Sequence, residues 1–301
     1  MNTLKNSLSR LFDFIIYGNV FIAFCAAMST YSTEFIINSS YTLPASTNSS
    51  FILHRLSLSI FVGVATFFLY NLHKPVTYFL KKQFTDNQRF TRTKAFQGPL
   101  SILSVLAAIY CIYYFFQLKT ASQCVLILMA FFSLGYVLPI LGNGQRLRDI
   151  PYLKIFLIVL VWSVTTVGLP FLELNNNIST LPFLRLCMGR SCFIFALCIP
   201  FDIRDMDWDS RTNVKTIPLS IGVEKAKISA ILALIISLSM CYLEKKIIMT
   251  NLTHDFKLII VYTITAFIIL KTHKNRSDYF FYIGVDGLIL LQSLLLSSNI
   301  N

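Results

Sequence analysis

The sequence predicts an all-α, polytopic membrane protein with about nine transmembrane helices around a central cavity, and three observations support this fold class. Hydrophobic residues make up 55% of the chain and charged residues 13%, and the mean hydropathy is +0.65, which is too apolar for a soluble domain. The length of 301 residues is enough for several membrane crossings. The apolar runs lack the alternation of barrel strands, so helices are the consistent spanning structure. We expect one domain, residues 1–301.

The individual helices are predicted from the lengths of the apolar runs. A helix needs about 20 apolar residues to cross the hydrocarbon core of a bilayer. The run at 256–271 is the shortest of those found, so a count that differs by one remains open there. Runs of suitable length occur at 12–31, 51–71, 97–117, 121–141, 153–173, 182–201, 226–243, 256–271 and 279–297.

Lys and Arg residues are distributed unevenly between alternate loops. Nineteen fall on the side that carries the N-terminus, five on the opposite side and two inside a span, which together make the 26 of the sequence. Positive charge concentrates on the cytoplasmic side, so the N-terminus is predicted to be cytoplasmic and the C-terminus outside. This topology also explains the net charge of +12, and no nucleic acid is expected as a partner. A basic rim equally suits anionic membrane lipids or a diphosphate substrate.

The most informative segment lies directly after the sixth apolar run, on the predicted cytoplasmic side, and contains Asp202, Asp205, Asp207 and Asp209. Carboxylates this close together at the end of a membrane helix require cations among them. At 100° per residue, Asp202, Asp205 and Asp209 fall within about 60° of one helix face, whereas Asp207 points away.

Two interpretations of this segment remain open from its spacing alone. Three carboxylates on one face suit a hard cation such as Mg²⁺, which prefers oxygen ligands and commonly bridges to phosphate oxygens. Asp202, Asp205 and Asp209 are the candidate ligands. Alternatively, the segment is a solvated acidic loop whose carboxylates pair with nearby basic residues. Those residues are Arg204, Arg211 and Lys215.

Here the sequence resembles the UbiA superfamily of intramembrane prenyltransferases. The second Asp-rich motif of that family has the form Asp-x-x-x-Asp after the sixth helix, and Asp205 and Asp209 match it. Arg204 matches the preceding Arg, and Lys215-Thr216 followed by Gly222 matches the downstream run. The resemblance implies that Asp205 and Asp209, assisted by Asp202, hold Mg²⁺ and that Arg204 and Lys215 contact a diphosphate. Asp205, Asp209 and Lys215 are thus the expected catalytic residues.

The chain departs from the family at the first Asp-rich motif, which the resemblance places at the end of the second helix. Asn71 matches the leading Asn of that motif, but Leu72, Pro75 and Phe79 stand where carboxylates are expected. The first metal site is therefore predicted to be lost, which leaves at most one Mg²⁺. Lys74 and its basic neighbours are candidates to bind the diphosphate directly, unless they only mark a helix end at the lipid interface.

Polar residues inside the apolar runs supply further candidates. Arg190 lies near the middle of the sixth run, where a charge is expensive and usually faces a cavity or a partner. We expect it to approach Asp286, the single acidic residue of the last run. Asn19, in the first run, either lines the cavity or bonds a neighbouring helix. Arg190, Asn19, Asn71, Lys74 and Arg204 are the candidate substrate-binding residues.

The resemblance implies transfer of an isoprenoid chain from a prenyl diphosphate to a lipophilic acceptor within the membrane. Its partners would be these two substrates and membrane lipids, with Mg²⁺ as cofactor. Since the first motif is missing, a competing hypothesis is a non-catalytic protein that binds a polyprenyl or lipid phosphate through the remaining motif. Whether the chain is an enzyme is left open by the sequence.

Overall fold

The computed structural model describes residues 2–41, 49–80, 96–141, 144–174, 180–248 and 252–297. Side chains are described for residues 10–38, 56–72, 96–141, 144–174, 180–243 and 256–297. All regular structure in these ranges is helical. The α-helices are α1 (Asn2–Tyr17), α2 (Val20–Tyr41), α3 (Ser49–Leu80), α5 (Gln97–Phe115), α6 (Thr120–Val137), α7 (Leu153–Ser163), α8 (Leu169–Leu174), α9 (Thr180–Arg211), α10 (Ile217–Ile221), α11 (Val223–Ile248), α12 (Leu252–Leu270) and α13 (Gly287–Ser297).

Among the residues that the structure describes, seven helical segments are long and apolar enough to cross a membrane. Two shorter apolar helices, Leu56–Leu72 and Phe256–Leu270, lie where two further spans are expected. The prediction of an all-α, multi-pass membrane protein is confirmed, while the count of nine and the orientation of the termini stay predictions. The seven are Val20–Asn38, Gln97–Phe115, Thr120–Val137, Leu153–Leu174, Thr180–Arg211, Val223–Leu243 and Phe280–Ser297.

The first span differs from the prediction. The apolar run at 12–31 is interrupted at Gly18 and Asn19, where α1 ends and α2 begins, and the spanning segment is Val20–Asn38. Asn19 has a left-handed backbone (φ 63°), which a helix cannot contain. Asn71 of α3 donates a hydrogen bond to the Gly18 carbonyl over 3.0 Å, so a contact from another helix satisfies the interrupted backbone. Hydropathy alone does not show such a break.

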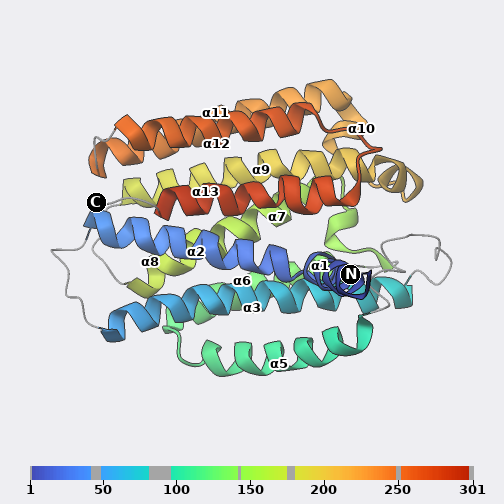
Figure 1. Cartoon of the computed structure of the whole chain (residues 1–301), viewed down its shortest axis with the longest axis horizontal. Coiled ribbons are helices and arrows are strands. Elements are labelled where there is room, and N and C mark those ends of the chain that lie inside the picture. The colour runs from blue at the N-terminus through green and yellow to red at the C-terminus, as the bar shows by residue number, and fades with distance from the viewer. Residues whose placement is uncertain are drawn as a thin grey trace.

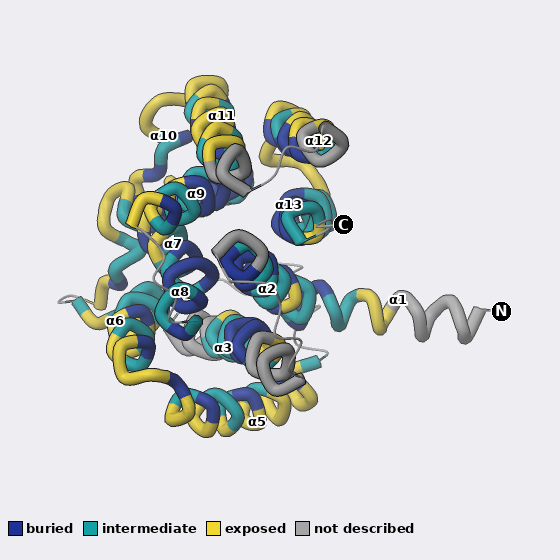
Figure 2. The backbone as a smooth tube through the Cα atoms, turned by 90° about the vertical axis from the view of Figure 1, so that its left-hand side faces the viewer, coloured by how far each residue is buried: buried dark blue, intermediate teal, exposed yellow. Residues whose placement is uncertain are grey.

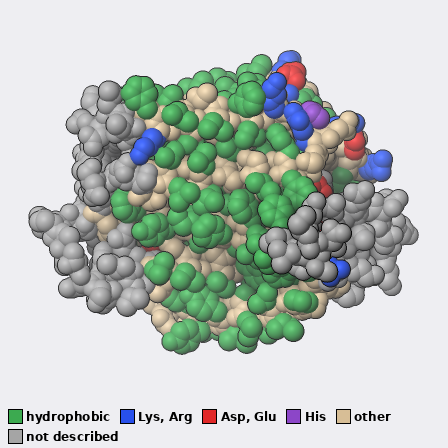
Figure 3. Space-filling model, viewed as in Figure 1, with side chains coloured by type: hydrophobic (Ala, Val, Ile, Leu, Met, Phe, Trp, Pro, Cys, Tyr) green, Lys and Arg blue, Asp and Glu red, His purple; other side chains and the backbone are tan. Residues whose placement is uncertain are grey.

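The long helices run roughly side by side along one axis (Figure 1), and viewed end-on α2 and α8 lie towards the middle, with α5, α6, α11 and α12 towards the outside (Figure 2). α9 packs against α11 and α7, and α2 packs against α3 and α13. The outer face of α5 is apolar and exposed at helical spacing, with Ile102, Ile109 and Ile112 each 59–66% exposed. Hydrophobic side chains cover the middle of the molecule (Figure 3), as expected for a surface in contact with lipid.

Two spans contain a π-helical turn. Val164–Gly168 joins α7 to α8, and Phe280–Val285 precedes α13. Such turns insert one extra residue, re-aim the side chains beyond them and are frequent at functional sites. The second turn places Asp286 at its end, between Gly284 and Gly287.

Candidate functional site

α9 carries the Asp-rich segment as a continuous helix. It runs from Thr180 through all four aspartates to Arg211, so the helical geometry assumed for the segment is correct. After the helix ends at Arg211, Asn213 adopts a left-handed conformation (φ 57°), and the N–H of Val214 donates to the carbonyl of Asp209 over 2.9 Å. This is the Schellman type of helix end, in which Asn often replaces Gly. We call the end of α9 that carries Asp202, Asp205, Asp207 and Asp209, together with the residues that contact them, the aspartate end.

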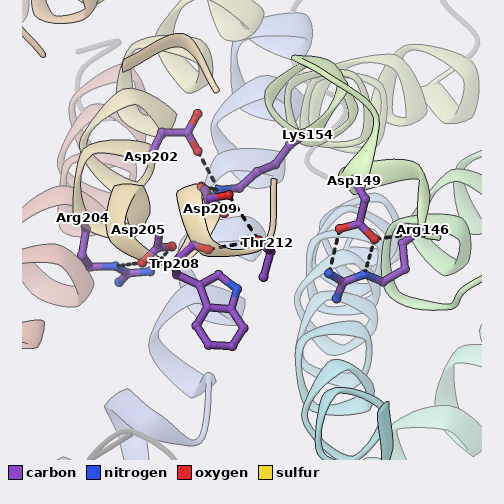
Figure 4. Close-up of polar contacts among 9 residues, drawn as sticks. All are labelled: Arg146, Asp149, Lys154, Asp202, Arg204, Asp205, Trp208, Asp209 and Thr212. Carbon is purple, nitrogen blue, oxygen red and sulfur yellow. Dashed lines mark hydrogen bonds and ion pairs between the residues drawn. The ribbon is translucent and has the colours of Figure 1, made fainter. Parts of the chain in front are cut away.

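The ammonium of Lys154 lies between two of the carboxylates (Figure 4). Its Nζ is 2.8 Å from Asp202 Oδ1 and 2.9 Å from Asp209 Oδ2. All three side chains are buried: the residues are 7%, 3% and 1% exposed, respectively. Lys154 lies in the first turn of α7, so the aspartate end joins two neighbouring helices through one buried cation.

Asp205 has a different partner. Arg204 donates to both of its oxygens, with Nε 2.8 Å from Oδ1 and Nη2 3.1 Å from Oδ2. The Arg204 guanidinium also lies 4.8 to 5.6 Å from the ring centres of Phe201, Phe281 and Tyr282. A planar cation held by a bidentate carboxylate and by aromatic faces is fixed in orientation. A carboxylate of the motif thus pairs with Arg204, as the acidic-loop interpretation expects, and a contact of Arg204 with a diphosphate stays a prediction.

Asp207 points away from the buried carboxylates, as its helical position predicts. Its side chain is 68% exposed and accepts from Lys274 over 3.2 Å. Figure 3 shows acidic and basic side chains gathered at one corner of the visible face, while the middle is apolar.

Lys215, an expected catalytic residue, is exposed, and its carbonyl accepts a hydrogen bond from the N–H of Tyr152 over 3.0 Å. Tyr152 has a left-handed backbone (φ 63°), and its hydroxyl bonds Ser220 over 3.1 Å. These contacts hold the chain immediately before α7. The contact that the structure shows for Lys215 is therefore made by its backbone, and a role of its side chain in catalysis stays a prediction.

The position of the missing first motif is occupied by an amide pair. Asn19 donates to Asn71 Oδ1 over 3.2 Å, and Asn71 donates to the carbonyls of Gly18 and Phe67, each over 3.0 Å. Of the two possibilities for Asn19, bonding to a neighbouring helix is the one observed. Lys74 falls within α3, but its side chain lies outside the described residues.

Arg190 is buried and bonded to α2. Its Nη2 lies 3.3 Å from the carbonyl of Ser29 and 3.4 Å from the hydroxyls of both Ser32 and Thr33. It precedes Asp202 by twelve positions on α9, or roughly 18 Å at 1.5 Å per residue, so the structure does not bring it to the aspartate end.

The expected pairing of Arg190 with Asp286 is not formed, although both side chains are described. Arg190 is held by α2, whereas Asp286 interacts electrostatically with Arg204. Asp286 also acts on Tyr70 of α3, which interacts with Trp162 of α7. Asp286 therefore interacts with groups of α9 and α3 rather than with Arg190.

The magnesium site expected from Asp202, Asp205 and Asp209 is not assembled. Within the described part of the chain, no group of three or more His, Cys, Asp or Glu side chains is arranged to hold a metal ion. Asp202 and Asp209 converge, but on Lys154, and Asp205 faces Arg204 instead. The residues present do not fit the single metal site that the resemblance implies.

Lys154 is not among the residues that the Asp-rich motif or the resemblance indicates. It is nevertheless a charged residue at the second position of the apolar run at 153–173. That position is the signal that would have identified it, since a charge inside a span needs a partner. Arg148 likewise interacts electrostatically with Asp209 and Asp205.

A separate apolar groove lies between α11 and α12. It is lined by Leu238, Ser239, Tyr242, Leu243, Leu258 and Ile259 and includes no residue of the aspartate end. The groove is therefore not the candidate site.

No family profile matches the sequence, and no curated protein matches it. Solved structures match it over nearly the whole chain. A UbiA homologue from Aeropyrum pernix K1, without ligand, gives a TM-score of 0.65 at 11% identity, covering 91% of this chain and 95% of the other. A UbiA homologue from Archaeoglobus fulgidus, bound to GPP and Mg²⁺, gives 0.63 at 12% identity, with 95% and 100% covered.

A digeranylgeranylglyceryl phosphate synthase gives a TM-score of 0.58 at 12% identity, covering 96% of this chain and 98% of the synthase. Identities this low establish the fold, and they do so for the complete bundle rather than for a part of it. The resemblance drawn from the Asp-x-x-x-Asp segment is confirmed at this level, and the chain has the fold of the UbiA superfamily.

Proposed function

We propose that this protein is a UbiA-like prenyltransferase, which binds a prenyl diphosphate at the aspartate end and transfers its isoprenoid chain to a lipophilic acceptor within the membrane. One observation carries the proposal. In a bundle with the UbiA fold, the Asp-rich motif lies on one continuous helix, where its carboxylates contact a buried Lys of the neighbouring helix α7 and a fixed Arg of the same helix. A neighbouring structure with the same fold is bound to GPP and Mg²⁺, which supports a prenyl diphosphate as the substrate class.

The chemical requirement of this reaction is positive charge around the departing diphosphate. In this chain, that charge lies on Lys154 and Arg204, with Arg148 nearby. In the proposed complex, the isoprenoid chain lies among the apolar side chains of the bundle. No step is assigned to a metal, because the carboxylates are already paired within the protein.

The second candidate is a non-catalytic protein that binds a polyprenyl or lipid phosphate at the same end. The specific observation in its favour is that Asp202, Asp205 and Asp209 are all engaged by internal cations, while Leu72 occupies a carboxylate position of the first motif. Such a protein retains the ligand without breaking its carbon–oxygen bond.

The two candidates are separated by following a labelled prenyl diphosphate on the purified protein in nanodiscs. Radiolabelled geranyl and geranylgeranyl diphosphate are supplied with a membrane lipid extract as the acceptor source, and both retained label and released pyrophosphate are measured. Pyrophosphate release that is lost in Arg204→Met but kept in Asp207→Asn supports a transferase. Label retained without release supports the binder, and no retention of either compound refutes both.

A gain-of-function variant sharpens this result. Replacing Leu72 and Pro75 together by Asp restores two carboxylates at the first motif. Cleavage that appears only in the double variant means that the natural chain has lost catalysis. Robust cleavage by the unmodified protein contradicts the binder.

A further inference from the structure

The cation at the centre of the aspartate end is a side chain of the protein itself. Lys154 Nζ contacts Asp202 at 2.8 Å and Asp209 at 2.9 Å, which are the distances of charge-assisted hydrogen bonds. The two carboxylates lie seven residues apart on α9, about two helical turns, and their oxygens reach the same atom. Figure 4 shows the ammonium between them.

A divalent ion cannot take the position between Asp202 and Asp209 that Nζ of Lys154 already fills. Mg²⁺ requires oxygens at about 2.0–2.1 Å in near-octahedral geometry, and the two converging carboxylates already direct oxygens at the ammonium. A dication beside a buried ammonium would be strongly repelled, because the low dielectric of the interior screens charge poorly. Asp205 is not a replacement ligand, since Arg204 engages both of its oxygens.

The placement of Lys154 is supported by its surroundings. Tyr152, two residues earlier, has a left-handed backbone that is unfavourable for a side-chain-bearing residue. It is held there by the carbonyl of Lys215 and the hydroxyl of Ser220. Strained backbone persists where the surrounding structure over-determines it. The first turn of α7, and with it Lys154, is thereby fixed against α9.

We infer that Lys154 is the permanent counter-ion of the aspartate end and occupies the position that a divalent metal would need, so this site works without a metal ion. Three carboxylates, Asp202, Asp205 and Asp209, are balanced by Lys154, Arg204 and the nearby Arg148. This inference rests on the proposed function for its second part, that binding of a prenyl diphosphate at this end does not require a metal ion.

The occupancy of the cluster is tested without any prenyl substrate, by electron paramagnetic resonance of Mn²⁺ added to the purified full-length protein, with Mg²⁺ as competitor. The wild type is expected to show no Mn²⁺ binding that depends on Asp202 or Asp205. Lys154→Met removes the ammonium while keeping an unbranched side chain, and it should raise Mn²⁺ affinity at least about tenfold, because the repulsion between the ammonium and the dication is removed. Lys225→Met, at an exposed position of α11, is the matched control and should change nothing.

Several outcomes overturn the inference. One is Mn²⁺ binding to the wild type that is lost in Asp202→Asn or Asp205→Asn. Another is a folded Lys154→Met protein that gains no Mn²⁺, because the ammonium is then not what excludes the metal. If Lys154→Met does not fold, Lys154→Gln is measured in its place. If neither variant folds, Mn²⁺ binding to the wild type alone tests the inference.

A second arm concerns the ligand. Binding of labelled geranyl diphosphate to the wild type is compared in excess EDTA and in excess Mg²⁺, and equal retention is expected. Retention that requires Mg²⁺ overturns metal-independent recognition. No retention in either condition contradicts the proposed function, while the Mn²⁺ measurement still decides which cation the cluster holds.

Discussion

α9 carries buried charge at two levels, and the two are neutralised differently. At the aspartate end, each buried carboxylate meets a full positive charge, from Lys154 or Arg204. Near the middle of the same helix, Arg190 meets only neutral oxygens of α2, and its Nη1 has no hydrogen-bond partner among the described residues. One level is an ion-pair cluster and the other a charge solvated by dipoles.

This difference predicts at which of the two levels the stability of the fold depends on the cation. Removing one partner of a buried ion pair leaves an uncompensated charge, which is among the most destabilising changes in a protein. Removing Arg190 leaves groups that still have partners, because the Ser29 carbonyl also accepts from the hydroxyls of Ser32 and Thr33. The predictions below test this contrast, in decreasing order of expected effect.

Lys154→Met should be the most destabilising of these substitutions, lowering the free energy of unfolding by about 3–5 kcal/mol, because Asp202 and Asp209 lose their shared cation while buried. Thermal unfolding of the detergent-solubilised protein measures the change. Lys225→Met, on the exposed face of α11, should stay within about 0.5 kcal/mol of the wild type. A loss no larger than that of this control would show that the carboxylates are neutralised in another way.

Arg190→Met should cost less, about 1–2 kcal/mol, because hydrogen bonds to neutral groups are lost but no opposite charge is left unpaired. The same unfolding measurement applies. A loss as large as that of Lys154→Met would mean that Arg190 has a charged partner, and the contrast between the two levels of α9 would not hold.

The pair of Asp149 and Arg146, which precedes α7, extends the comparison to the pH dependence of stability. Burial by itself raises the pKa of this carboxyl, but hydrogen bonds and charge from Arg146 outweigh burial and lower the pKa below its usual value. The pair therefore stabilises the folded state above the ordinary Asp pKa, and this contribution is lost as the pH falls through the lowered value. We expect Asp149→Asn to remove about 1 kcal/mol at pH 7 and to remove less as the pH falls. An equal effect of the substitution at pH 7 and pH 3 would contradict this linkage.

The exposed pair of Asp207 and Lys274 should show the smallest effect. The two side chains are 68% and 53% exposed, and such pairs contribute about 0.2–1 kcal/mol at most. Lys274→Ala should therefore shift the unfolding temperature by little more than the measurement error, and less still in high salt. A loss comparable to that of Lys154→Met would show that this surface is buried by something else in the membrane.

Parts of the fold and of the site followed from local patterns. The apolar runs predicted the helices, and the helical spacing predicted that Asp202, Asp205 and Asp209 share one face while Asp207 points away. Asp202 and Asp209 do converge and Asp207 is exposed, whereas Asp205 faces Arg204. The partners did not follow, because neither hydropathy nor spacing indicates which helices are neighbours. Asn19 was thus correctly marked as polar within a span, but its bond to Asn71 depends on α3 lying beside the end of α1.

Composition, the lengths of the apolar runs and residue identity were enough to predict an all-α membrane bundle, its Asp-rich motif and the loss of carboxylates at the first motif. Only the tertiary structure decided that α7 lies against α9 and brings Lys154 between Asp202 and Asp209. The physical reason is the range of the interactions. Hydrophobic periodicity is a property of a single helix, whereas a buried charge pairs with a group on any helix that packs within a few ångströms of it.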